Sequence, residues 1–170
     1  MVKDDDLQKI QEQIGRNPKG LVDVAFRCPG GQPAVIRTKP LIRRRDGFEL
    51  FPTLFWLTCP SLAEQIAEIE SRGYIERLEE ELNANPWLKQ KYLHQERRYR
   101  SERRGLLSLS ERNFVASRDL WDEFSKGIGG IEDRHHIKCL HLHVAHHLPR
   151  ENVLGKMLME RFNLTFCSAS

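Results

Sequence analysis

The feature that most constrains the fold is a change of hydrophobic pattern at Pro60. Before Pro60, short runs rich in Val, Ile, Phe and Trp are separated by Gly and Pro, which is typical of β-strands and turns. After it, apolar residues recur at helical spacing. Strands that come first and helices that follow predict an α+β fold with a small antiparallel sheet.

The sheet section is expected at 19–59, with about three strands at 21–26, 34–38 and 53–58. An N-terminal helix lies within 1–18, a helical section covers 60–150, and a C-terminal helix with its tail occupies 151–170. Five to six helices are expected to pack on the sheet. The first helix after the sheet is capped by Ser61 with Glu64. The helices that follow it are expected at 74–83, 86–104, 110–124, 133–148 and 152–162. The 170 residues fit a single domain, 1–170.

Composition gives the expected compartment. The first six residues, MVKDDD, are acidic and unlike a secretory signal, and no apolar run reaches the roughly 18 residues that span a bilayer. A cytoplasmic protein without a membrane partner is therefore expected. Because cytosolic thiols stay reduced, the four cysteines favour metal ligation, a reactive thiol or simple burial over disulfides.

Six of the seven histidines lie between residues 134 and 148. If one helix begins at Asp133, then Cys139, His143 and His146 share a face opposite an apolar stripe, whereas His141 points into the apolar side. Thiolate and imidazole at i, i+4 and i+7 are suitable ligands for zinc. A solvated, pH-sensitive histidine surface is the alternative interpretation.

Two more cysteines follow predicted strands, Cys28 in a glycine turn and Cys59 before a capped helix, where a lowered thiol pKa is expected. We therefore predict that Cys28, Cys59, Cys139 and His146 bind one zinc ion in a closed structural site. An iron–sulfur cluster is the alternative cofactor. Buried, idle cysteines are the simpler interpretation, and Cys167 is expected to be uninvolved.

Several of these motifs together resemble a family of small bacterial proteins without assigned activity, domain of unknown function 501. The matching segments are Arg27-Cys28 with Gly31 and Pro33, Phe51-Pro52-Thr53 with Leu57-Thr58-Cys59-Pro60, Gly129-Gly130-Ile131, and Lys138-Cys139-Leu140-His141 with Ala145-His146. The resemblance implies a pattern centred on the three cysteines with His141 and His146. It makes His141 a further candidate ligand, and His143 stays a candidate from its spacing. It supplies no reaction.

Residues 89–104 hold seven basic and two acidic side chains, with Tyr92 and Tyr99 interleaved. Such a helix suits phosphate contacts and base stacking, so RNA is one predicted partner. The candidate contacts are Lys89, Arg97, Arg100 and Arg104. In the alternative interpretation, the basic face is solvated, or it is neutralised by pairing with the glutamate-rich segment 60–84.

Two classes of function follow from these patterns. The first is an intracellular binding module that a structural zinc ion stabilises and that acts on RNA or a protein partner. The second is a metalloenzyme or iron–sulfur redox protein that uses an open coordination position at the same Cys/His site. No complete catalytic signature decides between them, and whether the chain is an enzyme is left open.

Overall fold

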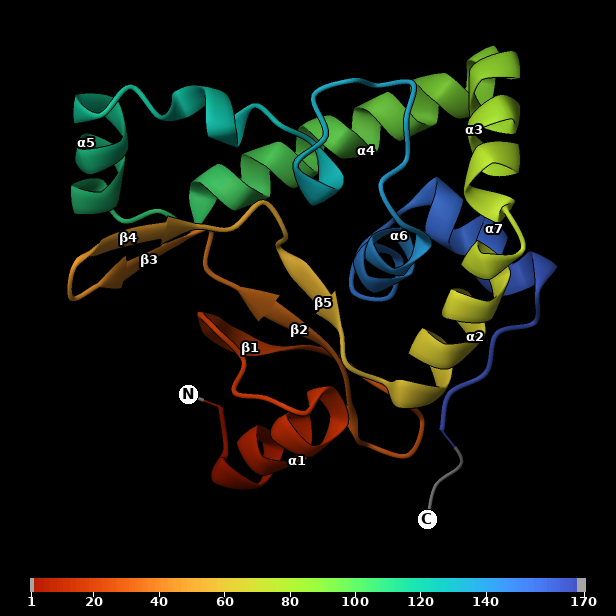
Figure 1. Cartoon of the computed structure of the whole chain (residues 1–170), viewed down its shortest axis with the longest axis horizontal. Coiled ribbons are helices and arrows are strands. Elements are labelled where there is room, and N and C mark those ends of the chain that lie inside the picture. The colour runs from red at the N-terminus through yellow and green to blue at the C-terminus, as the bar shows by residue number, and fades with distance from the viewer. Residues whose placement is uncertain (1, 168–170) are drawn as a thin grey trace.

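The computed structural model describes residues 2–167 and confirms the α+β fold (Figure 1). Strands β1 (Leu21–Arg27), β2 (Pro33–Thr38) and β5 (Phe55–Leu57) form an antiparallel sheet in the order β1-β2-β5. Val35 of β2 pairs with Leu57 of β5, and both β2 neighbours run antiparallel to it. Because β2 is the central strand, it is the most deeply buried of the three.

The structure also contains a second, two-stranded sheet, which the sequence analysis does not predict. Strands β3 (Leu41–Arg44) and β4 (Gly47–Leu50) form a hairpin around Arg45-Asp46. The Asp46-Gly47 pair is a hairpin signal, but three consecutive arginines hide the strand pattern around it. The hairpin needs little apolar surface of its own, since Leu41 anchors it in a small core with residues from the helical section.

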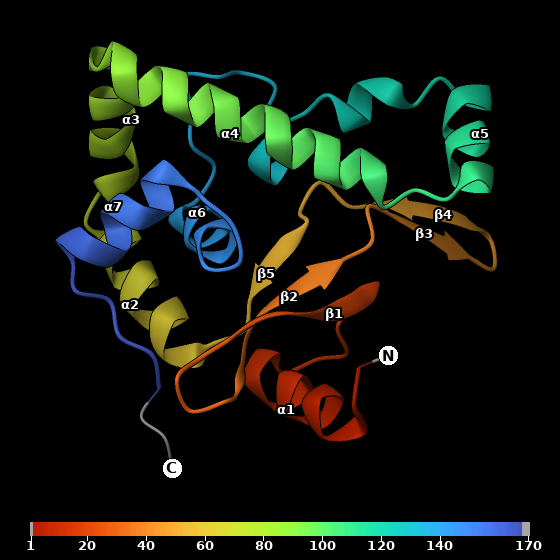
Figure 2. The same cartoon turned by 180° about the vertical axis from the view of Figure 1, so that it is seen from behind.

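Helices surround the three-stranded sheet. In both views α1 (Asp4–Ile14) and α4 (Pro86–Gly105) lie on opposite sides of the molecule, with the sheet and α6 between them (Figures 1 and 2). The others are α2 (Pro60–Ser71), α3 (Tyr74–Ala84), α5 (Leu109–Ser117), α6 (Leu140–His147) and α7 (Val153–Arg161), with 3₁₀ turns at Trp121–Phe124 and Ile128–Gly130. No helix within residues 2–167 has the length and apolar content to span a membrane.

Three predicted helix boundaries are corrected. In α2 the N-cap position is Cys59 and Pro60 lies in the first turn, so the predicted capping box of Ser61 and Glu64 does not form. That motif occurs at α5 instead, where Ser108 and Glu111 satisfy each other's backbone N–H groups. Helix α5 ends at Ser117, well before Phe124, because the chain turns at Asp119 with a positive φ of 53°.

The third correction concerns the histidine helix, which begins at Leu140 and not at Asp133. Side-chain carboxylates occupy the backbone N–H groups that an earlier helix would use. Asp133 accepts from His135 N at 2.8 Å, and Glu79 of α3 accepts from Ile137 N at 2.6 Å. Local and long-range acceptors therefore hold the segment before Leu140 in a non-helical conformation.

A buried arginine joins α4 to two loops. Arg103 is 1% exposed, its Nε donates to the carbonyl of Phe51 at 3.1 Å, and its Nη1 donates to the carbonyl of Glu123 at 2.9 Å. The guanidinium also lies 4.9 Å from the ring centroid of Phe124. Arg103 thus connects the chain before β5, the basic helix and the 3₁₀ turn.

Replacing Arg103 by Met should destabilise the protein by about 2–4 kcal/mol, because two partly buried carbonyls lose charged donors. Arg104→Met is the matched control, since the neighbouring side chain is exposed and should cost less than about 1 kcal/mol. Urea unfolding of both variants measures the difference. Equal stabilities would contradict the role assigned to Arg103.

Candidate functional site

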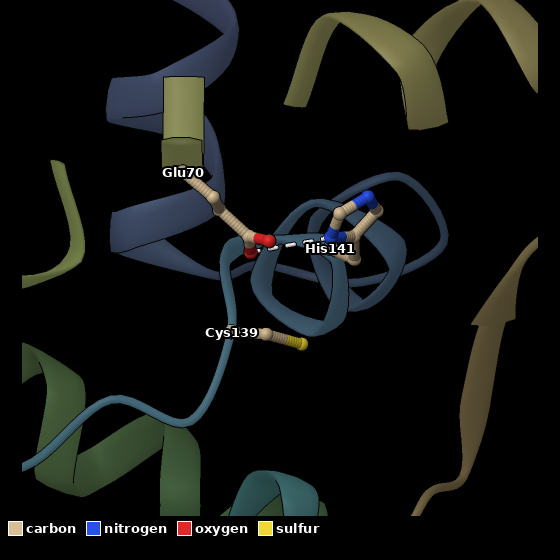
Figure 3. A group of neighbouring side chains, drawn as sticks. All are labelled: Glu70, Cys139 and His141. Atoms are coloured by element: carbon tan, nitrogen blue, oxygen red, sulfur yellow. Dashed lines mark hydrogen bonds and ion pairs between the residues drawn. The ribbon is translucent and has the colours of Figure 1, made fainter. Parts of the chain in front are cut away.

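Three potential metal ligands converge where α2 ends and α6 begins (Figure 3). Glu70 reaches from the last turn of α2, Cys139 directly precedes α6, and His141 lies in the first turn of α6. The ligand atoms of the three all lie within 4.8 Å of one another. All three side chains are partly buried, so the group remains accessible from solvent.

Hydrogen bonds fix the orientation of the His141 ring. Its Nε2 lies 3.0 Å from the carbonyl oxygen of Ala63, which can only accept, so Nε2 carries a proton. Its Nδ1 then faces Oε1 of Glu70 at 3.2 Å. A lone pair on Nδ1 would repel that carboxylate, so this position favours a proton or a metal ion.

The electrostatics of the protein without metal agree with this geometry. The hydrogen bond with Cys139 and, after it, the charge of Glu70 raise the pKa of His141 to about 9, against the opposing effect of burial. Positive charge is therefore stabilised between these side chains. The donor set is one oxygen, one nitrogen and one sulfur, a combination that borderline metals such as zinc accept.

Two of the residues singled out in the sequence, Cys139 and His141, belong to this group, whereas Cys28, Cys59 and His146 do not. Within residues 2–167, no three of the predicted ligands Cys28, Cys59, Cys139 and His146 bring their ligand atoms within 4.8 Å of one another. Cys28 and Cys59 are buried in the largest hydrophobic core. Joint ligation by those four side chains stays a prediction.

Cys59 differs from expectation in two respects. Burial raises the pKa of its thiol, so the dipole of α2 does not give the lowered value that its helix-terminal position suggested. Its Sγ also lies 3.6 Å from Sγ of Cys167, a residue expected to be uninvolved. The two thiols pair near the start of α2 and the end of the described chain.

A second polar cluster lies on another side of α6. Positions 141 and 146 are separated by about 140° around a helix, so His146 faces away from Glu70. His143 and His146 are 2% and 3% exposed, and both contact aromatic rings. Tyr92 of α4 lies against His143, and Phe55 of β5 stacks on His146.

One amide holds both buried imidazoles. Asn152 caps α7, and its Oδ1 accepts from Gly155 N at 2.8 Å, so its Nδ2 must be the atom that faces the histidines. Nδ2 lies 3.3 Å from Nδ1 of His143 and 3.1 Å from Nδ1 of His146. Because Nδ2 donates both bonds, both Nδ1 atoms accept, and both rings carry their proton on Nε2.

Burial is the main cause that lowers the pKa of His143 to about 4 and that of His146 to about 3. Positive neighbours, including Arg150, lower the pKa of His146 further. Both imidazoles are therefore neutral at pH 7, in contrast to His141.

The predicted RNA-binding residues have mixed environments. Lys89 contacts Asn83 and the carbonyl of Arg134, whereas Arg100 and Arg104 bond to Ser125. Arg97 is exposed. RNA binding through these four side chains stays a prediction.

Tyr92 and Tyr99 are buried, so their rings are not available for the predicted base stacking. Within residues 2–167, the glutamates of α2 and α3 form no ion pair with α4, so direct ion pairing does not support the alternative interpretation, and a solvated basic face stays a prediction.

Sequence reasoning missed Glu70. In the sequence it is one of several glutamates in 60–84. The available signal was its spacing from Ala63, because residues seven apart lie on the same face of a helix. In the structure these two positions of α2 both contact His141.

We expect the imidazoles of His143 and His146 to be Nε2–H tautomers that stay largely neutral at pH 5. Their pKa values lie below the ordinary 6.5, so the unfolded chain binds more protons. The stability they confer is thus full above about pH 6.5 and is lost as the pH falls toward 4. Two-dimensional ¹H–¹⁵N spectra of the histidine rings report tautomer and charge. An Nδ1–H tautomer, or titration of either ring near pH 6.5, would contradict the assignment.

Comparison with known proteins gives a family and no activity. No curated protein and no solved structure matches the chain. The sequence profile of a family described as "Protein of unknown function (DUF501)" matches residues 24–160, which include Glu70, Cys139 and His141. That match covers most of the chain, and the protein belongs to the DUF501 family.

Proposed function

We propose that this protein binds one transition-metal ion, with zinc as the first choice, through Glu70, Cys139 and His141. The observation that carries the proposal is the fixed orientation of His141. Its Nε2–H bonds to the Ala63 carbonyl, and this leaves Nδ1 directed at a carboxylate and a thiol. A backbone carbonyl that orients the second ring nitrogen is a common feature of metal-bound histidines.

The number of protein ligands bears on the kind of site. A structural zinc site is usually closed by four protein ligands, whereas a catalytic site has three and leaves one position for water or substrate. Three donors and partial exposure therefore support an open coordination position. This geometry favours the metalloenzyme alternative over a purely structural zinc ion.

The same geometry argues against an iron–sulfur cluster. Such clusters are held mainly by cysteine thiolates. The group contributes one thiolate, and Cys59 pairs with Cys167 instead. Zinc accepts the mixed set of oxygen, nitrogen and sulfur without a second cysteine.

Metal content of purified variants tests the ligand set. Glu70→Gln, Cys139→Ser and His141→Ala should each lower bound zinc at least about tenfold, because each removes one of three donors. Cys28→Ser, Cys59→Ser and His146→Gln are the matched controls and should retain zinc. Elemental analysis measures both groups.

The two predicted ligand sets share Cys139, so the other variants distinguish them. Zinc that survives Glu70→Gln and is lost in Cys28→Ser and Cys59→Ser would overturn the proposed site in favour of the four-residue one. Zinc absent from the wild-type protein after reconstitution would overturn both.

Added zinc should stabilise the folded protein, because Glu70 and Cys139 come together only when α2 packs beside the start of α6. At a hundredfold excess over Kd, one-site binding contributes about 2.7 kcal/mol, or a rise in Tm of about 5–10 °C for a chain of this size. Thermal melting of metal-free protein with and without zinc measures the rise. Glu70→Gln should show little of it, and an equal rise in that variant would contradict the assignment.

A further inference from the structure

A basic groove runs between α4 and the connection from α6 to α7, at residues 148–152. The helices α4 and α7 lie next to each other there (Figure 2). Two cavities of about 470 and 320 Å³ form the groove, and they share Gln95, Arg98 and Glu151 as lining residues. Each cavity lies within the size range of small-molecule sites. This groove is separate from the Glu70–Cys139–His141 group.

The larger cavity has a strong excess of positive charge. Lys91, Arg97, Arg98 and Lys156 line it, together with one carboxylate, Glu151. The ion pair between Arg98 and Glu151 is long, at 3.9 Å, and both side chains are well exposed. The pair of Lys156 with Glu160, at 3.7 Å, is similarly exposed. Such pairs neutralise little charge, so the cationic groups remain available to a ligand.

The floor of the groove presents hydrogen-bond donors. His146 lines the smaller cavity, and Asn152 fixes its proton on Nε2, which has no acceptor among residues 2–167. Gln95 lines both cavities, and its Oε1 accepts from Val153 N at 2.7 Å. Its Nε2 amide group is therefore left as a donor. Tyr99 adds no acceptor, because its hydroxyl already bonds to Leu54 N and to the Pro52 carbonyl. Glu102, which also lines the smaller cavity, accepts two hydrogen bonds from Arg150.

The ends of the groove add two further features. Asn152 and Val153 line the larger cavity, so the N-terminal, positive end of α7 faces it. Trp87 lines the same cavity and is 59% exposed, which offers an aromatic surface at the rim. The larger cavity thus combines cations with a helix N-terminus, the donor of His146 lies in the adjoining smaller cavity, and Gln95 lines both.

We propose that this groove binds a small phosphate-bearing molecule. The groove combines several cations with hydrogen-bond donors that have no partner within the described residues. A phosphate group matches this combination, because it carries several acceptor oxygens and more than one negative charge. The cavities also favour a small molecule over RNA, since Arg100 and Arg104 do not line them and are bonded to Ser125. Inorganic phosphate, pyrophosphate and a nucleotide share this chemistry, and the experiment distinguishes them.

Isothermal titration calorimetry of the full chain with inorganic phosphate, pyrophosphate and adenosine diphosphate tests the proposal at low salt. Saturable binding of at least one probe is expected. The double substitution Arg98→Gln and Lys156→Gln should weaken it about tenfold or more, because two charged hydrogen-bond donors are lost. Tighter binding of the nucleotide than of pyrophosphate would assign the Trp87 surface to the base.

The matched control is Lys9→Gln with Arg77→Gln, which removes the same two charge types outside the groove. This control should bind like the wild type, and metal-free wild-type protein should give the same titration, so the outcome is independent of the metal site. Equal weakening in the control, or no saturable binding of any probe, would overturn the proposal. Binding of single-stranded RNA without binding of the three probes would also overturn it.

Discussion

The hydrogen bond from Leu140 N to the Glu70 carboxylate determines much of this structure, because it fixes where α6 begins. The start of a helix sets the direction of every side chain that follows. With Leu140 first, His141 faces α2, whereas His143 and His146 face α4 and β5. A helix that began before Cys139 would instead have placed the thiol on the face of His143 and His146, away from Glu70. This one long-range contact therefore places His141 in the candidate metal site and leaves His143 and His146 in a separate buried cluster.

Sequence patterns predicted the parts of the fold that depend on local chemistry. The α+β class, the three-stranded sheet and helices α3 and α4 follow from periodicity and from prolines at helix starts, and all are observed. The patterns did not predict features that depend on contacts between residues far apart in the sequence, such as the start of α6. The acceptors that delay α6, Glu79 and Glu70, lie about 60 to 70 positions away. Cys139 and His141 were recognisable as candidates, but their partner Glu70 was visible only once α2 was placed.

Helix α4 shows why composition alone does not tell which side chains of a charged helix reach the surface. Its sequence is dominated by charge, yet it buries Tyr92, Glu96, Tyr99 and Arg103. Three of them have backbone partners that offset the cost of burial: Glu96 accepts from Ile128 N, Tyr99 bonds to two backbone groups, and Arg103 bonds to two carbonyls. A basic helix can thus be a central structural element while its remaining cations line a cavity.

The shared amide of Asn152 has a consequence for which residues this position tolerates. An aspartate has nearly the same shape and caps helices equally well, so local rules would accept it. A carboxylate, however, presents only acceptors, and both imidazoles would have to move their protons to Nδ1 to remain bonded. The Nε2 atom of His146 at the groove would then change from donor to acceptor. Helix capping thus depends on Oδ1 of Asn152, whereas the polarity of the groove floor depends on the two hydrogen atoms of Nδ2. A substitution that is silent for α7 would therefore invert the polarity of the groove floor.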